Sequence, residues 1–261
     1  MDYASYIKGI SFRFLPPSKP RPKGFRAVNG LLRRVGIQLE VANTRLPCDA
    51  RETKRRLREV CRIPRMSTFA IGAMINRAVA QLPKNQAFVN VGVWNGFTFF
   101  SGLSGNSGKT CIGVDNFSHK DSPKSAFFSR FEKFAGKQHS FHERDYREYF
   151  AHVHTEPIGF YLFDGPHSYA DQLDGLRMAE PFFAEHCIVM VDDSNWDQVR
   201  KANLDFMAEG PNKWRILLDE RTPKSGHPTY WNGLMIFQLV GPNKLTKGKD
   251  AGQTKKKPKA A

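Results

Sequence analysis

Two hydrophobic patterns alternate along the middle of the chain. Short runs of consecutive apolar residues are separated by longer segments in which apolar residues recur every three to four positions. The first pattern is typical of buried strands and the second of amphipathic helices. The apolar runs predict strands over residues 87–93, 110–114, 140–143, 158–163, 187–191, 214–218 and 234–240. Strands that alternate with helices predict an α/β fold, namely a doubly wound, Rossmann-like, seven-stranded and mostly parallel sheet with an antiparallel last strand.

The segment from Ile158 to Trp196 contains the clearest strand, helix, strand unit. Its first strand ends in Asp164, its second ends in Asp192 and Asp193, and the residues between them have helical periodicity. The two strands of such a unit are parallel and, when adjacent, lie about 4.8 Å apart. We therefore expect the three carboxylates to converge at the edge of the sheet where open α/β folds bind ligands. Converging carboxylates repel one another, and a bound cation is the usual remedy.

The net charge of +15 belongs to the ends of the chain. Residues 1–65 hold 16 Lys and Arg against 5 Asp and Glu, and residues 243–261 hold 7 against 1, whereas residues 66–242 hold 17 against 19. We therefore divide the chain into a basic N-terminal extension (1–65), a core domain (66–242) and a Lys-rich, disordered tail (243–261). The extension would cap the core or serve as a lid. Four prolines among basic residues predict that residues 1–30 resist regular structure.

Composition also narrows the setting. No apolar run approaches the roughly 18 residues of a membrane span, and the N-terminus lacks a secretory apolar stretch, so a cytoplasmic protein is expected. The four cysteines are widely spaced and indicate neither a disulfide framework nor a zinc site. Nucleic acid or an anionic surface would be reached only through the basic ends. Oligomerisation stays open.

A glycine-containing loop follows the first core strand. In Asn90-Val91-Gly92-Val93-Trp94-Asn95-Gly96, the GxxxG spacing before a helix lets the backbone approach a ligand closely. Asp115 ends the next strand, where an acidic residue can accept hydrogen bonds from both hydroxyls of a ribose. A helix cap or a surface turn is the alternative role for Asp115.

These segments resemble a known family. The sequences NVGVWNG, GVD, FDGPHSYADQLDGL and IVMVDDSNW are similar to those of class I S-adenosylmethionine-dependent methyltransferases, and closest to the macrocin O-methyltransferase and cephalosporin-hydroxylase-like branch. The resemblance covers roughly residues 67–240 and leaves both basic ends unmatched. It implies S-adenosylmethionine as cofactor.

The resemblance also assigns cofactor-binding residues. Gly92 and Gly96 would face the methionine part, Asp115 would hold the ribose, and Asp145, with Tyr146 beside it, would lie near the adenine. The family usually has Glu or Asp where this chain has Asn90, whose amide can accept a hydrogen bond but carries no countercharge. The full predicted set is Asn90, Gly92, Trp94, Gly96, Asp115, Asp145 and Asp164.

The same resemblance makes Asp164, Asp192 and Asp193 metal ligands, and oxygen ligands suit Mg²⁺. Each aspartate alone would equally suit a helix cap. His167 corresponds to the proposed catalytic base of sugar O-methyltransferases, although a lone histidine at a helix start is otherwise usually a cap. Trp196 and Trp231 would wall the acceptor site or belong to the core. The remaining histidines are expected at the surface, including His139, His142, His152 and His154.

These features predict a Mg²⁺-assisted O-methyltransferase that acts on a hydroxyl of a sugar or natural-product-like small molecule. A coordinated cation stabilises the alkoxide that such a hydroxyl must become. One alternative is a catalytically silent binding module that acts through its basic ends. The other, a nucleic-acid methyltransferase, ranks last, because Asp164-Gly165-Pro166-His167 stands where base methylation at an exocyclic nitrogen typically uses an Asn/Asp-Pro-Pro-aromatic segment.

Overall fold

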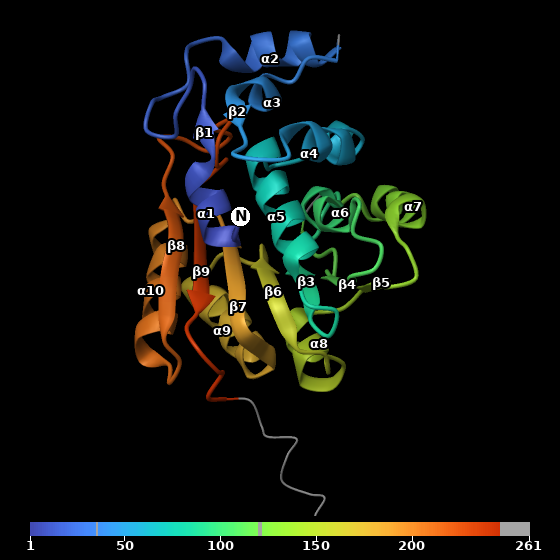
Figure 1. The fold of residues 1–261 in the computed structure, drawn as a ribbon, viewed down its shortest axis with the longest axis vertical. Helices are drawn as coiled ribbons and strands as arrows, with labels where there is room; N and C mark the ends of the chain where they lie inside the picture. The colour runs from blue at the N-terminus through green and yellow to red at the C-terminus, as the bar shows by residue number, and fades with distance from the viewer. Residues whose placement is uncertain (35, 120–121, 246–261) are drawn as a thin grey trace, which may run out of the picture.

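The computed structural model describes residues 1–34, 36–119 and 122–245, and Figure 1 shows the chain as a ribbon. The strands of the large sheet are β3 (Ala87–Val91), β4 (Thr110–Val114), β5 (His139–His142), β6 (Ile158–Phe163), β7 (Phe183–Asp192), β8 (Trp214–Glu220) and β9 (Leu234–Leu239). Among the described residues they form one seven-stranded sheet in the order β5-β4-β3-β6-β7-β9-β8.

The sheet grows in two directions from β3. This strand pairs in parallel with β4 on one side and with β6 on the other, and β4 with β5 and β6 with β7 are parallel as well. Only β9 runs against its neighbours β7 and β8. The predicted mostly parallel sheet with an antiparallel last strand is confirmed. In open sheets, ligands bind at the carboxyl ends of the strands where the order reverses, here beside β3.

Helices cover both faces of the sheet, as a doubly wound fold requires. The helices are α1 (Tyr3–Gly9), α2 (Phe25–Arg34), α3 (Leu39–Asn43), α4 (Ala50–Leu57), η1 (Val60–Arg62), α5 (Phe69–Gln81), α6 (Phe97–Leu103), α7 (Lys124–Phe134), α8 (Tyr146–His152), α9 (Tyr169–Ala179), η2 (Glu180–Phe182) and α10 (Asp197–Glu209). Of the helices described, none is long and apolar enough to cross a bilayer.

Alternate residues of the central strands enter two separate cores. Phe88 of β3 and Phe160 of β6, whose ring centroids lie 5.0 Å apart, belong to the core under α1, α5 and α6. The next residue in each strand, Val89 and Tyr161, belongs to the core under α8, α9 and α10. Successive side chains of a strand point to opposite faces, so strands buried on both faces read as the continuous apolar runs seen in the sequence.

The N-terminal segment is more regular than its composition predicts. Besides four helices and η1, it forms a small antiparallel sheet of β1 (Ser11–Phe12) and β2 (Thr44–Arg45). The Asp2 carboxylate accepts the Ser5 N–H at 3.0 Å and starts α1, whose Tyr6 and Ile7 are each 1% exposed in the same core as α5. The expectation that residues 1–30 resist regular structure is therefore wrong, because the prolines are confined to the loop between β1 and α2.

The two ends of the chain differ in how they meet the core. In Figure 1, α1 lies against the sheet, while α2, α3 and α4 are drawn beyond its upper end. The boundary at residue 65 and the lid role stay predictions. Of the predicted tail, residues 246–261 lie outside the described residues. Asn243, at its start, donates from Nδ2 to the carbonyl oxygens of Glu180 and Phe183 at 2.7 and 2.9 Å.

His154 departs from the predicted surface position, which is wrong for this residue. It is 5% exposed, and its Nε2 donates to the Glu156 carbonyl oxygen at 2.7 Å while its Nδ1 accepts from the Tyr149 hydroxyl at 2.8 Å. Burial lowers the pKa of His154 to about 4 from its usual 6.5. The ring is therefore neutral in the folded protein at neutral pH.

We expect His154 to make the fold acid-sensitive. Between pH 6.5 and about 4 the unfolded chain takes up a proton at this residue and the folded chain does not. The free energy of unfolding therefore has its full value above this window. It falls by about 3 kcal/mol as the pH falls through the window, at 1.36 kcal/mol per pKa unit. Urea unfolding across this range measures the slope. His154→Gln should flatten the slope and exposed His152→Gln should keep it; equal slopes in wild type and His154→Gln would contradict the assignment.

Candidate active site

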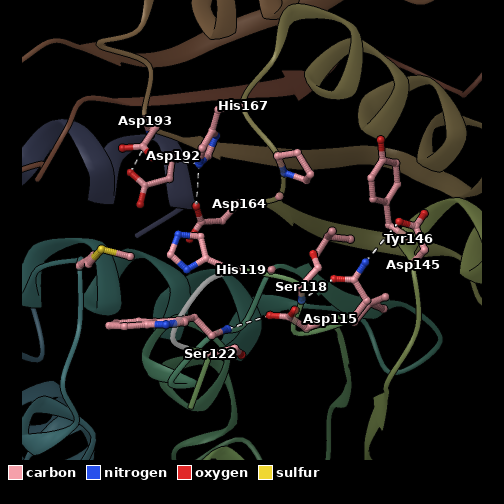
Figure 2. Close-up of a pocket in the computed structure, with 18 of the residues that line it drawn as sticks. Asp115, Ser118, His119, Ser122, Asp145, Tyr146, Asp164, His167, Asp192 and Asp193 are labelled. Atoms are coloured by element: carbon pink, nitrogen blue, oxygen red, sulfur yellow. Dashed lines mark hydrogen bonds and ion pairs between the residues drawn. The ribbon is translucent and has the colours of Figure 1, made fainter. Parts of the chain in front are cut away.

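A cavity of about 540 Å³ opens at the carboxyl ends of the central parallel strands (Figure 2). Its volume lies in the range of small-molecule sites. The predicted site residues that line it are Gly92, Trp94, Asp115, Asp145, Asp164, His167, Asp192 and Asp193. Tyr146, Trp196 and Trp231 line it as well. Asn90 and Gly96 do not belong to its lining.

Gly92 has a backbone position that only glycine can hold. Its φ is +78°, and a Cβ built there would lie 1.9 Å from the carbonyl oxygen of Asp164. The Asp164 N–H in turn donates to the carbonyl oxygen of Val91 at 3.0 Å. The turn after β3 is thereby closely packed against the turn after β6, and the predicted close approach of backbone is present between two parts of the cavity wall.

The carboxylate of Asp115 holds the turn after β3 in place. Its Oδ2 accepts the N–H groups of Val93 and Trp94 at 2.8 and 2.9 Å, and its Oδ1 accepts the N–H of Phe117 at 2.7 Å. A carboxylate offers about four acceptor positions. Asp115 therefore keeps one free position, on Oδ1, for a ligand such as a ribose hydroxyl.

Asn90 and Gly96 support the turn from behind. Asn90 is fully buried, and its Nδ2 donates to the carbonyl oxygens of Val91 and Gly92 at 3.2 and 3.1 Å. Its Oδ1 has no hydrogen-bond partner within the described part of the chain. Gly96 has φ +92° and precedes α6, where a Cβ would meet the ring of Phe100 at 2.1 Å. Both residues shape the loop and do not reach the cavity surface.

Asp145 lies at the side of the cavity farthest along the sheet from the acidic residues (Figure 2). As the N-cap of α8, it accepts the Arg147 N–H at Oδ1 over 2.8 Å, and Asn116 donates to its Oδ2 at 3.4 Å. The ring of Tyr146 stands beside it. This placement leaves room for the predicted adenine position, which stays a prediction.

A carboxylate and imidazole cluster forms the opposite side of the cavity. Ligand atoms of Asp164, His167 and Asp193 all lie within 4.8 Å of one another. His167 Nε2 is 3.0 Å from Asp193 Oδ2 and 3.9 Å from Asp164 Oδ1. The predicted third ligand, Asp192, also lines the cavity but accepts the Asp193 N–H at 2.9 Å and lies outside this convergent group.

The acidic residues lie beside one another, and this affects the ionisation of two of them. The pKa of Asp164 is raised well above its usual range by burial, and further by the carboxylates of Asp192, Asp193 and Asp115. Burial also raises the pKa of Asp192, with the charge of Asp193 adding to the effect. Bringing such groups together costs free energy unless a cation neutralises them. Oxygen ligands of this kind fit a divalent cation such as Mg²⁺.

His167 is oriented by its carboxylate neighbour. Its Nε2 lies within hydrogen-bonding distance of Asp193 Oδ2, at 3.0 Å. Nδ1 is buried and has no hydrogen-bond partner among the described residues. The indole of Trp196 contacts the imidazole edge-on, with ring centroids 4.7 Å apart. A histidine oriented by a carboxylate at the wall of a cavity is an arrangement that suits a general base.

Two contributions to the site have no local sequence signal. Asn232 donates from Nδ2 to Asp193 Oδ1 at 2.6 Å and fixes that carboxylate, whose backbone has φ +58°. His119 also lines the cavity, in the loop after β4. The two tryptophans left open between acceptor wall and core both line the cavity.

Comparison with known proteins finds one family model and several solved structures similar to this chain. Residues 89–194 match the family model described as a methyltransferase domain. No curated protein matches the chain by sequence. Among solved structures, cofactor-bound Rv0187 from MTB superposes with a TM-score of 0.54 at 12% identity, over 87% of this chain and 100% of that one. The O-methyltransferase from Bacillus cereus in complex with SAH gives 0.52 at 11% identity, over 82% and 97%.

The chain shares its Rossmann-like fold with those two structures at low identity. The family match covers most of the residues that line the cavity and supports methyl transfer as the class of activity.

Gly92→Ala tests the contact on which the cavity wall depends. A Cβ at Gly92 would overlap the Asp164 carbonyl, and a non-glycine residue at this φ is strained in any case. We expect the free energy of unfolding to fall by about 2 kcal/mol or more. Gly108→Ala is the matched control, since a Cβ there meets no atom within 4 Å. Chemical denaturation measures both, and equal stabilities would show that the turn rearranges freely.

Proposed function

We propose that this protein is an S-adenosylmethionine-dependent O-methyltransferase, assisted by Mg²⁺, that methylates a hydroxyl of a sugar or natural-product-like small molecule. The observation that carries the proposal is the pairing of His167 with Asp193 and Asp164 in the same cavity as the Gly92 turn. The candidate proton acceptor, the candidate cation ligands and the candidate site of the methyl donor therefore line the same cavity. The macrocin O-methyltransferase and cephalosporin-hydroxylase-like branch is proposed on the DGPHSY and VDD segments.

The cofactor would lie along the turns after β3, β4 and β5. The Gly92 turn lines this part of the cavity, Asp115 has one acceptor position left, and Asp145 with Tyr146 lines the far end. When bound, S-adenosylmethionine supplies a methyl group on a sulfonium that an oxygen nucleophile can displace. The residues of the chain supply position and charge for this displacement.

Asp164 and Asp193 would hold the cation, with Asp192 behind them. A bound Mg²⁺ would stabilise the alkoxide form of the acceptor and neutralise the raised-pKa carboxylates. Asn232 would keep Asp193 in place for this role through its hydrogen bond to Oδ1.

His167 would take the proton that leaves the acceptor hydroxyl. The imidazole that would receive it lines the cavity and lies beside Asp193 and Asp164. The imidazolium that forms remains paired with the Asp193 carboxylate, which lowers its energy. Trp196 holds the ring edge-on and limits its rotation.

The catalytically silent module and the nucleic-acid methyltransferase are outcomes that experiment separates from this proposal. Binding of nucleic acid or an anionic surface through the basic ends, and oligomerisation, likewise stay predictions.

His167→Ala tests the proposed base. We expect turnover of a methylated acceptor to fall by about 10²- to 10⁴-fold, because proton abstraction is lost. The dissociation constant of S-adenosylmethionine should be unchanged, because the cofactor site is formed by other turns. Isothermal titration with S-adenosylmethionine and a labelled-methyl transfer screen of glycoside acceptors provide the two readouts.

The control for this variant is exposed His152→Ala, which should match the wild type in both readouts. Undiminished turnover in His167→Ala would remove the base assignment. Failure of the wild type to bind S-adenosylmethionine at millimolar concentration would remove the proposed activity and favour the silent module.

Magnesium binding should be visible without any acceptor. At a Mg²⁺ concentration ten times the dissociation constant, binding to the folded state contributes about 1.4 kcal/mol, which raises the melting temperature by a few degrees, about 3 to 6 °C. Asp164→Asn should abolish the increase, whereas Asp197→Asn, whose side chain is 88% exposed, should keep it. NaCl at matched ionic strength controls for screening. Equal shifts with NaCl and MgCl₂ in the wild type would argue against a specific site.

A further inference from the structure

A second cavity adjoins the first and shares the lining residue Trp231 with it. It has a volume of about 230 Å³ and is lined by residues of α2, of the loop before it and of the connection between β8 and β9. Met66 lines the first cavity, while its neighbours Arg65 and Ser67 line the second. Ser225 lines the first and Gly226 the second in the same way. Trp231 lines both cavities.

Three unpartnered polar atoms belong to residues lining this second cavity. Arg65 Nε, Ser67 Oγ and Asn29 Oδ1 are buried and have no hydrogen-bond partner in the described part of the chain. The Arg65 side chain is 2% exposed and Ser67 is 5% exposed. Buried polar atoms without partners cost about 1–3 kcal/mol each. Their concentration around one cavity points to a ligand that supplies the missing bonds.

The surrounding contacts fix these atoms rigidly. The Arg65 guanidinium forms an ion pair with Glu40, and its Nη2 donates to Glu40 and to Gln38 Oε1. The guanidinium carbon lies 4.8 Å from the centre of the Phe97 ring. Phe97 begins α6, directly after the turn of the first cavity. Nε therefore keeps its direction whether or not a ligand is present.

The chemistry of the lining distinguishes between ligands. Arg65 Nε can only donate, Asn29 Oδ1 can only accept, and the Ser67 hydroxyl can do both. Arg21 also lines the cavity and would attract an anion, but an ionised carboxylate offers no proton to Asn29 and would meet the carboxylate of Glu40. A hydroxyl both donates and accepts. The rings of Phe25 and Trp231 add apolar surface for the C–H face of a sugar ring.

We propose that this second cavity is an acceptor subsite that binds an uncharged sugar ring, joined across Trp231 to the ring whose hydroxyl lies in the first cavity. The proposal rests on the proposed function for the identity of the reacting ring and extends it to a substrate with at least two rings. The cavity is too small for a larger group, since drug-sized ligands need roughly 300 Å³ or more. The N-terminal segment would thus select the acceptor through Asn29 and Arg65.

Sugar binding can be measured independently of methyl transfer. Saturation-transfer NMR with an equimolar mixture of maltose, cellobiose, lactose and sucrose should show saturation of at least one disaccharide by the wild type. In Ser67→Ala and in Asn29→Ala we expect that signal to fall at least threefold, because each variant removes one hydrogen-bonding group. The matched controls are Ser129→Ala and Asn85→Ala, which change exposed residues outside both cavities and should keep the wild-type signal.

Three results would overturn the subsite. The first is that the wild type saturates no sugar, which would mean that the cavity holds water only. The second is that Ser67→Ala and Asn29→Ala give the same signal as the wild type. The third is that inorganic phosphate or glucuronate displaces the sugar. Melting temperatures identify a variant that fails to fold, and the second variant then decides.

The outcome is separable from that of the proposed function. Sugar saturation without S-adenosylmethionine binding would support the subsite and remove the proposed methyltransferase activity. Methyl transfer to a methyl monoglycoside without any disaccharide saturation would support the activity and remove the subsite. Where both hold, Ser67→Ala should raise the KM of the disaccharide about tenfold at unchanged kcat and leave the KM of the methyl monoglycoside as in the wild type.

Discussion

The close contact between the turn after β3 and the turn after β6 is the constraint on which the site depends. Val91 and Phe163 are register partners in the parallel pairing of β3 and β6, so the next residues, Gly92 and Asp164, meet at the carboxyl edge. With no side chain at Gly92, the Asp164 carbonyl lies where a Cβ would be. The acidic edge and the glycine turn therefore form one continuous wall, and any bound donor and acceptor would lie within reach of each other.

The acidic edge brings several carboxylates close together. Asp192 is buried and Asp164 is partly buried beside other carboxylates, the pKa of both is raised, and His167 Nε2 lies 3.0 Å from Asp193 Oδ2. Such a group stores unfavourable charge that a divalent cation relieves. Asn232 steadies Asp193 from the connection before β9, so the same segment that closes the cavity with Trp231 also orients a candidate metal ligand.

Much of this could be predicted from local pattern, because strand periodicity and strand-end residues depend on short stretches of chain. The seven strands, their parallel order beside Asp164, Asp192 and Asp193, and the turn at Gly92 all follow from such stretches. Two predictions failed because the contacts that decide them are not visible in the local pattern. Proline content masked the cap at Asp2 that starts α1, and His154 carries no pattern that reveals its bonds to Tyr149 and Glu156.

The sequence by itself determined the fold class, the turn that needs glycine and the acidic strand ends, since each is encoded within a few neighbouring residues. Only the tertiary structure decided that Asn90 and Gly96 stay behind the cavity surface, that Asp115 spends most of its acceptor capacity on backbone, and that Arg65, Asn29 and Trp231 enclose a second cavity. These outcomes come from contacts across long separations, such as the Arg21 bond to the Ser225 carbonyl at 3.0 Å, and packing between distant segments leaves no periodic trace in either one.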